Sequence, residues 1–288
     1  MQSIKAWFFV LLQFIVPKLL ITKIIYRITR IEQNNFKNLL INKFINLFQI
    51  NTQEVKKSIP ADFASLNEFF IRELNSDARI ISTSPKSIVS PADGKISALG
   101  NITKNQILQA KNYYYTLEEL IGDPALAIEE FYNGNFSTIY LAPHNYHRVH
   151  IPIDAKLIKM DYAPGNLFSV NEATASRIPK LFIRNERLIC HFKAGNTKMI
   201  VIFVGALNVG SISTPWTGEI NPRNNGKIVE LNLNQTVPFT LKKGDLLGWF
   251  NMGSTVITLF SKDSCQWDHR LKHGHDIKMG DIIGSLNI

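Results

Sequence analysis

The chain has 288 residues, of which 45% are hydrophobic, and its formal net charge at pH 7 is +9. This length and composition are typical of a folded protein with one large core and an appendage, and they exclude a fully disordered chain. Residues 1–50 carry +6 of the charge, with Glu32 as their single acid, so the basic excess belongs to an apolar N-terminus. That placement favours an anionic membrane over nucleic acid as a partner, because no basic and aromatic platform follows it. Cys190 and Cys265 form no CxxC pattern, which predicts a reducing compartment.

Two apolar segments, 6–16 and 19–30, open the chain on either side of Pro17-Lys18. Eleven helical residues cover only about half of a ~30 Å hydrocarbon core, so neither segment spans a membrane comfortably. No small-residue cleavage site follows, which disfavours a signal peptide. We therefore expect helices that lie in the interface of an anionic leaflet, with a buried pair of core helices as the alternative. Residues 34–50 predict a further amphipathic helix.

A short helix is expected after Ser65, and beyond it the sequence changes to short β-branched and aromatic runs separated by Gly, Pro, Asn and Asp. Only 116–120 and 124–131 look like helical insertions. The pattern predicts an α+β fold, with a membrane-associated helical region over 1–60 and a mostly antiparallel, sandwich- or barrel-like β-rich domain over 61–288. The predicted strands are 87–90, 95–99, 136–141, 148–153, 157–162, 188–192, 198–204, 209–213, 227–233, 246–250, 255–260 and 282–286.

An internal repeat lies near the C-terminus. Residues 241–248 and 277–284 share the pattern apolar, Lys, any residue, Gly, Asp, apolar, apolar, Gly. Each copy predicts a Gly-Asp turn that leads into a strand, so two equivalent hairpins are expected.

The first motif with chemical potential is Pro91-Ala92-Asp93-Gly94-Lys95, between two apolar runs. Taken alone it predicts a turn, since Asp-Gly between apolar runs is common in hairpins. A chemical role for Asp93 requires a histidine partner elsewhere in the fold.

A histidine cluster supplies candidates: His144, His147 and His150 lie between Pro143 and Pro152. Clustered imidazoles suggest zinc, but strand geometry sends positions three apart to opposite faces, and no Cys or HExxH pattern completes a metal shell. Two separate proton-transfer roles suit His147 and His150 better, and a structural histidine is the alternative for either.

The third motif is Met252-Gly253-Ser254-Thr255, between two apolar runs. It is not a GxSxG nucleophile elbow, which disfavours an α/β-hydrolase. With Asp93 and His150, Ser254 still offers an orienting group, a base and a hydroxyl. The glycine leaves the carbonyl of residue 253 sterically open. A serine hydrolase with an intact chain and a chain that cuts its own backbone both remain open at this point.

These motifs, in this order, resemble the phosphatidylserine decarboxylases of the bacterial membrane-bound type. The resemblance covers nearly the whole chain and includes LNEFFIREL, SPADGKIS, YHRVHIP, APGNLFSVNEAT and GSTVITLF. Met252 stands where the family usually has Leu, and this substitution nearly conserves side-chain volume. The resemblance outweighs two other hypotheses, a non-enzymatic membrane adaptor and a lipoyl-like carrier, since Lys278-Met279 reverses the Met-Lys order of a carrier site.

The resemblance implies that Asp93, His150 and Ser254 form a charge relay for autocatalytic cleavage between Gly253 and Ser254. The products are a β chain of residues 1–253 and an α chain of residues 254–288, which form a heterodimer that assembles further in some members. Ser254 becomes a covalent pyruvoyl group, and no metal is needed.

The resemblance also implies decarboxylation of phosphatidylserine to phosphatidylethanolamine in phospholipid biosynthesis. The pyruvoyl group forms a Schiff base with the substrate amine, and His147 is the proton donor. The enzyme is expected on the cytoplasmic face of the cell membrane, as a peripheral protein. The loop 162–171, with Phe168 and Ser169, is the candidate lipid-binding segment, and an ordinary surface loop is the alternative.

Overall fold

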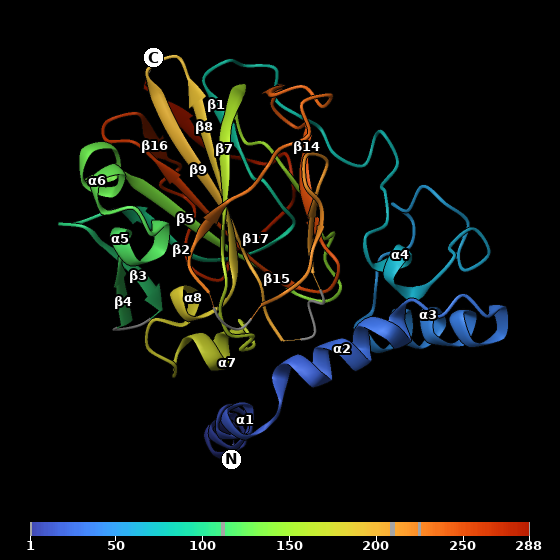
Figure 1. Ribbon diagram of the computed structural model, residues 1–288. Helices are drawn as coiled ribbons and strands as arrows, with labels where there is room; N and C mark the ends of the chain where they lie inside the picture. The colour runs from blue at the N-terminus through green and yellow to red at the C-terminus, as the bar shows by residue number, and fades with distance from the viewer. Residues whose placement is uncertain (1, 111–112, 208–210, 224–225, 288) are drawn as a thin grey trace.

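The computed structural model describes residues 2–110, 113–207, 211–223 and 226–287, and it confirms the α+β fold (Figure 1). Four helices precede the β-rich body: α1 (Gln2–Ile15), α2 (Lys18–Thr29), α3 (Asn34–Phe48) and α4 (Leu66–Phe70). The axes of α1 and α2 are bent by 94° at Pro17-Lys18. Within the described chain, no single helix has both the length and the apolar character needed to cross a membrane.

The helices α3 and α4 share a small apolar core that is separate from the main core. Gln33 caps α3 by accepting the N–H of Phe36 at 2.7 Å, and Ser65 caps α4 by accepting the N–H of Glu68 at 3.2 Å. The shared core contains Ile41, Phe44, Ile50, Val55, Phe63, Leu66, Phe69 and Phe70. This core contains residues from both the helical region expected over 1–60 and the domain expected over 61–288. We therefore treat residues 34–75 as one unit and call it the helical module.

The β-rich body is built from antiparallel pairs of strands, arranged in sheets of nine, four, three and two strands. The nine-stranded sheet runs β12-β7-β8-β9-β15-β5-β2-β17, and β13 also pairs with β7. The smaller sheets run β11-β10-β14-β6, β1-β18-β16 and β3-β4. The strands are β1 (Ser87–Val89), β2 (Gly94–Asn101), β3 (Gln106–Ala110), β4 (Tyr113–Thr116), β5 (Asn135–Leu141), β6 (Arg148–His150), β7 (Ala155–Ala163), β8 (Arg187–Ala194), β9 (Thr197–Val204), β10 (Ile212–Thr214), β11 (Gly218–Ile220), β12 (Val229–Glu230), β13 (Thr240–Leu241), β14 (Leu246–Phe250), β15 (Ser254–Phe260), β16 (Cys265–Trp267), β17 (Asp276–Ile277) and β18 (Ile282–Leu286).

Short helices cover the edges of this body. They are α5 (Leu117–Ile121), α6 (Pro124–Leu126) with a π-helical turn over Ala127–Phe131, α7 (Glu172–Ala175) and α8 (Leu181–Arg184). The two helical insertions expected from the sequence are therefore confirmed. In Figure 1 the N-terminal helices extend from one end of the body, where α1 packs on α7 and α3 on α4.

Most predicted strands are confirmed, and the exceptions have local causes. The strand predicted over 148–153 ends at His150, because Pro152 cannot donate to a ladder. Of the strand predicted over 227–233, the structure forms only β12. The first two residues of the strand predicted over 209–213 lie outside the described residues. The hairpin β3-β4 was missed, since two of its three buried positions are the polar or aromatic Gln109 and Tyr115, beside the aliphatic Ile107.

The repeated Gly-Asp motifs form two equivalent turns. In each, the aspartate three residues further on accepts the N–H of a lysine, at 2.6 Å from Lys242 and 2.7 Å from Lys278. Gly244 and Gly280 have φ angles of 89° and 95°, a region that glycine enters without strain. Both glycines also lie against Ile81, because a Cβ atom on either would come within 3.0 Å or 2.8 Å of that side chain.

Neither turn closes a hairpin, and this expectation was wrong. On either side of the first turn, β13 pairs with β7 and β14 with β6. On either side of the second, β17 pairs with β2 and β18 with β1. Each turn therefore carries the chain from the nine-stranded sheet to a smaller sheet. The motif specifies the turn, whereas long-range burial of the flanking apolar residues decides the pairing.

The two corners that face these turns are joined to each other. The backbone N–H of His150 donates to the carbonyl of Pro91 at 2.8 Å, and that of Val89 donates to the carbonyl of Pro152 at 3.1 Å. The corner between β1 and β2 thus lies against the corner between β6 and β7. This arrangement brings the Asp93 segment next to the His150 segment.

Candidate active site

Ser254 is the first residue of β15, the strand at the centre of the nine-stranded sheet. All seven residues of β15 are buried, and the strand pairs with β5 on one side and β9 on the other. Ser254 itself lies opposite Leu141 of β5. Its Oγ atom is buried and has no hydrogen-bond partner among the described residues. Other buried hydroxyls of the described residues, including that of Thr255, also lack a partner, so what distinguishes Ser254 is its position at a cavity.

A cavity of about 300 Å³ opens onto Ser254 and Gly253. Aromatic side chains of the helical module form one wall, and a loop preceding α7 contributes to another. The lining residues are Phe44, Phe48, Phe70, Tyr140, Leu141, Pro143, Ser169, Val170, Asn171, Ala206, Leu207, Met252, Gly253 and Ser254. An apolar site with a few polar groups is the usual form of a small-molecule pocket.

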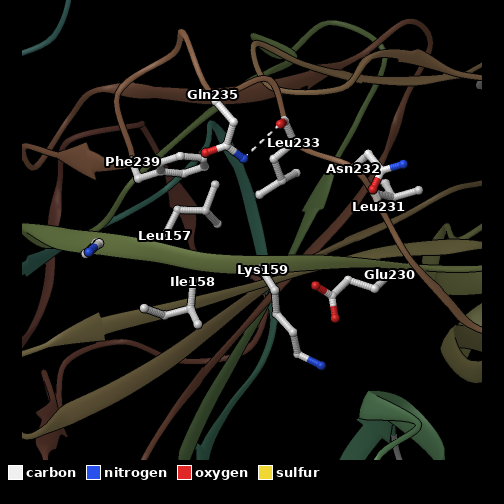
Figure 2. Close-up of a pocket in the computed structure, with 10 residues that line it drawn as sticks. Leu157, Ile158, Lys159, Glu230, Leu231, Asn232, Leu233, Gln235 and Phe239 are labelled. Carbon is white, nitrogen blue, oxygen red and sulfur yellow. Dashed lines mark hydrogen bonds between the residues drawn. The ribbon is translucent and has the colours of Figure 1, made fainter.

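A second hollow, of about 470 Å³, lies over β7 and the segment 230–239 (Figure 2). Its lining includes Lys156, Lys159 and Glu230 and none of the site residues expected from the sequence. The candidate active site is therefore the cavity at Ser254.

His147 lies directly beside the Gly253-Ser254 bond. A Cβ atom built on Gly253 would be 3.7 Å from Cε1 of His147, so the ring lies against Gly253. The imidazole is fully buried and stacks on Phe70, with ring centroids 4.0 Å apart and planes 23° apart. Burial, with a smaller effect from the positive charge of Arg72, lowers the pKa of His147 well below its usual value. The ring is therefore neutral at physiological pH.

His150 does not line the cavity at Ser254 and is held by two hydrogen bonds. Its Nδ1 lies 2.8 Å from the carbonyl of Gly244, and because a carbonyl only accepts, Nδ1 carries the proton. Its Nε2 then accepts the hydroxyl of Tyr146 at 2.9 Å. Burial lowers the pKa of His150 to about 4. His150 is thus a neutral imidazole with a basic nitrogen, and that nitrogen faces Tyr146.

Asp93 is held by an arginine rather than by a histidine. Arg79 donates to both carboxylate oxygens, at 3.1 Å from Nε and 2.5 Å from Nη2. The N–H of Met279 donates to Oδ1 at 2.7 Å. At the equivalent corner, Asp154 accepts the N–H of Lys243 at 2.8 Å. Capping a Gly-Asp turn is therefore a structural role that both aspartates share, and the buried pairing with Arg79 is particular to Asp93.

The structure does not join the three expected relay residues by hydrogen bonds. Asp93 and His150 come from corners that contact each other, but their side chains bond to other partners, and neither bonds to Ser254. Of the two histidines, His147 precedes β6 and lies against Gly253, whereas His150, the last residue of β6, bonds to Gly244 and Tyr146.

The loop with the candidate lipid-binding residues contacts the helix α1. Ser169 lines the cavity, and its N–H donates to Oε1 of Gln13 at 2.8 Å. Phe168 is buried and packs on Phe14 with ring centroids 5.1 Å apart, so it does not line the cavity itself. Sequence reasoning missed Gln13, Arg79 and Phe70, because no local spacing marks a partner that lies far away along the chain.

Replacing His150 with Gln should reduce the stability lost on acidification. His150 has a pKa of about 4 in the folded protein, whereas an unperturbed histidine has a pKa of 6.5. As the pH falls, the unfolded state therefore takes up the proton before the folded state does. The contribution of the neutral ring is complete above pH 6.5 and is lost as the pH falls towards 4. Between pH 7 and pH 5 the parent should lose on the order of 2 kcal/mol more than His150→Gln. Urea unfolding measures this, with Ser254→Ala in both proteins to keep the backbone intact. Equal losses would contradict burial of a neutral ring.

Comparisons with known proteins place the chain in a family. A family model described as phosphatidylserine decarboxylase matches residues 66–285, and a second, described as PSD, matches residues 8–49. The phosphatidylserine decarboxylase proenzyme of Glaesserella parasuis is 42% identical over 278 residues, which cover 96% of this chain and 94% of the relative. The proenzyme of Haemophilus ducreyi is 43% identical, over 95% of this chain and 93% of the relative. That of Francisella philomiragia is 44% identical, over 91% of this chain and 92% of the relative. These matches confirm the resemblance seen in the motifs, and the chain belongs to the phosphatidylserine decarboxylase family of enzymes.

Proposed function

We propose that this chain is a proenzyme that cuts itself between Gly253 and Ser254 and then converts phosphatidylserine to phosphatidylethanolamine and CO₂. The observation that carries the proposal is the Ser254 hydroxyl, which is buried and unpartnered among the described residues and lines an apolar cavity beside a neutral imidazole. The names of the relatives, which call them proenzymes, support the processing step.

Self-cleavage begins when the Ser254 hydroxyl gives its proton to a base and Oγ attacks the carbonyl carbon of Gly253. The bond from that carbon to the Ser254 nitrogen breaks, the nitrogen takes up the proton, and an ester links the two residues. Elimination of the Gly253 carboxylate leaves dehydroalanine at position 254. Water then replaces its nitrogen, which leaves as ammonia, and a pyruvoyl group remains.

The relay proposed for this step uses His150 as the base and Asp93 as the group that stabilises its charge. Both residues must exchange partners to do so. His150 has to release Tyr146, and Asp93 has to share its carboxylate with Arg79. The contact between their two corners favours this rearrangement, because the backbone bond from His150 to Pro91 already holds the segments together.

The residues around position 254 fit a pyruvoyl group. This group supplies a ketone conjugated to an amide, which accepts the electrons released when CO₂ departs. His147 is the proposed proton donor to the carbon that loses CO₂, since its buried ring lies at the Gly253-Ser254 junction. Phe44, Phe48 and Phe70 exclude water from the cavity, which protects that carbon from protonation by solvent.

We also propose that α1 and α2 dock the enzyme on the anionic, cytoplasmic face of the cell membrane. Their exposed apolar side chains include Ile4, Phe8 and Ile15, with 74%, 69% and 81% of their surface accessible. Apolar burial and the basic charge of this region act together at such a surface. Gln13, buried in α1, connects this face with the cavity loop by its bonds to Ser169 and to Thr174 at 2.8 Å and 3.2 Å.

The two chains left after cleavage are expected to stay together as a heterodimer. In the α chain, β15 lies between β9 and β5, and β18 pairs with β1, all of which belong to the β chain. Separating the products would expose the buried strand β15, so the sheet holds them without the peptide bond.

The defining test is the intact mass of the purified protein, with Ser254→Ala as the control. The proposal predicts two fragments, 1–253 and 254–288, with a blocked N-terminus on the smaller one, and no cleavage of Ser254→Ala. Hydroxylamine should abolish phosphatidylserine decarboxylation because it captures a ketone. A wild-type chain that stays at full length with a free Ser254 would refute the proposal, and inactivation by serine-phosphorylating reagents would favour a hydrolase.

The two histidines should separate the two steps. We expect His147→Ala to be cut and to turn over phosphatidylserine at least ~100-fold more slowly, since general acid catalysis typically contributes 10²–10⁴-fold. His150→Ala and Asp93→Asn should remain uncut. Fragment analysis and CO₂ release measure the two steps separately. The opposite pattern, with His147→Ala uncut and His150→Ala cut, would transfer the base role to the imidazole that lies at Gly253.

Gln13→Leu should uncouple membrane binding from activity. The variant makes α1 more apolar, so it should bind anionic vesicles at least as well as the wild type. Losing the hydrogen bonds to Ser169 of the cavity loop and to Thr174 of α7 should reduce kcat/KM on vesicle substrate about tenfold. Phe8→Ala is the matched control, because it removes an exposed apolar group and should weaken vesicle binding instead. Normal turnover by Gln13→Leu would show that α1 does not position the loop.

A further inference from the structure

Asn67 of α4 holds the chain just before the Gly253-Ser254 bond. Its side chain is buried, and its Nδ2 donates to the backbone carbonyl of Asn251 at 2.8 Å. The same nitrogen lies 3.5 Å from Oδ1 of Asn251. This contact spans 184 positions of sequence and connects the helical module with the segment to be cut.

Asn251 is fixed from the opposite side as well. Its N–H donates to the carbonyl of Ser211 at 3.0 Å. Its side-chain Nδ2 donates to the hydroxyls of Ser211 and Ser213, at 2.7 Å and 3.0 Å. Asn251 is therefore held on one side by Ser211 and by Ser213 of β10, and on the other side by Asn67 of α4. Its backbone has little freedom to move.

Only Met252 and Gly253 connect this fixed point with the next one. Ser254 already belongs to the ladders of β15, where it lies opposite Leu141. Consecutive Cα atoms are about 3.8 Å apart, so two linking residues between two fixed ends have few available paths. Met252 also packs against the apolar core of the helical module, which restricts the linker further. The direction of the Gly253 carbonyl thus depends on where Asn251 is held.

We infer that Asn67 is a positioning residue for self-cleavage: by holding the Asn251 carbonyl, it aims the Gly253 carbonyl at the Ser254 hydroxyl. The inference rests on the proposed processing step and adds to it a residue outside the relay. A displacement of the order of 1 Å between reacting groups is enough to slow a reaction about 100-fold. The helical module therefore takes part in forming the cut as well as in lining the cavity.

The test compares Asn67→Leu and Asn67→Asp with Asn75→Leu. Asn75 is the control, since its Nδ2 also donates to a backbone carbonyl of the same module, that of Gln53 at 3.3 Å, through an exposed bond away from Asn251. Freshly translated precursor is followed over time by intact mass between pH 5 and pH 8. Asn67→Leu should be cut at least about tenfold more slowly than the wild type, as expected for one lost buried hydrogen bond. Asn75→Leu should be cut at the wild-type rate.

Asn67→Asp provides a readout that a purely structural role would not change. An ionised carboxylate cannot donate to the Asn251 carbonyl, whereas a protonated one can. Cleavage of Asn67→Asp should therefore accelerate as the pH falls from 8 to 5, a change that the wild type should not show, since the proposed base His150 has a pKa of about 4 and stays neutral over this range. Asn67→Leu should remain slow throughout this range.

The outcomes separate the two claims. If the wild type and Asn75→Leu are not cut, the processing step itself fails. If both are cut and Asn67→Leu is cut at the same rate as they are, the positioning role of Asn67 is overturned. It is also overturned if both Asn67 variants are slow at every pH and unfold at lower urea concentration than the parent in a Ser254→Ala background, because that pattern describes a damaged fold.

Discussion

The constraint on which this molecule depends is the fixed position of β15. The strand is buried along its whole length and pairs on both sides, so a shift of its register would break its ladders with β5 and β9 together. Ser254, its first residue, therefore cannot move towards a partner. Every group that acts on its hydroxyl has to be brought to it by other parts of the chain. The same pairing would retain the short fragment after the proposed cleavage.

The two corners beside the Gly-Asp turns show how a structural repeat acquired one chemical difference. Asp93 and Asp154 cap equivalent turns through the N–H groups of Met279 and Lys243. Asp154 remains exposed, whereas Asp93 is buried against Arg79. A buried ion pair of this kind costs desolvation and is not needed to form the turn, since the equivalent turn forms without one. The extra burial at Asp93 thus reflects the site, where His150 approaches from the opposing corner.

Sequence periodicity predicted the elements well and their partners poorly. The helices α1 to α3 and strands such as β14, β15 and β18 have the apolar patterns of elements that are buried on one or both faces. Their positions could therefore be predicted from short stretches of sequence. Other features depend on residues that are distant along the chain. These are the passage of both Gly-Asp turns from one sheet to another, the pairing of Asp93 with Arg79 and the contact of Asn67 with Asn251. His147 and His150 do lie in different surroundings, as expected from the sequence, but His147 precedes β6, so strand alternation does not explain the difference.

The helical module joins these features into one site. Phe70 stacks on His147, Asn67 holds Asn251, and Arg72 donates to the carbonyls of His144 and Asn145 at 2.9 Å and 3.1 Å. The three residues lie within one short stretch around α4, yet they contact both the histidine segment 144–147 and the segment just before the scissile bond. Because β15 cannot move, the orientation of these segments is set by how α4 packs. The geometry proposed for cleavage is therefore complete only when the helical module has folded onto the sheets.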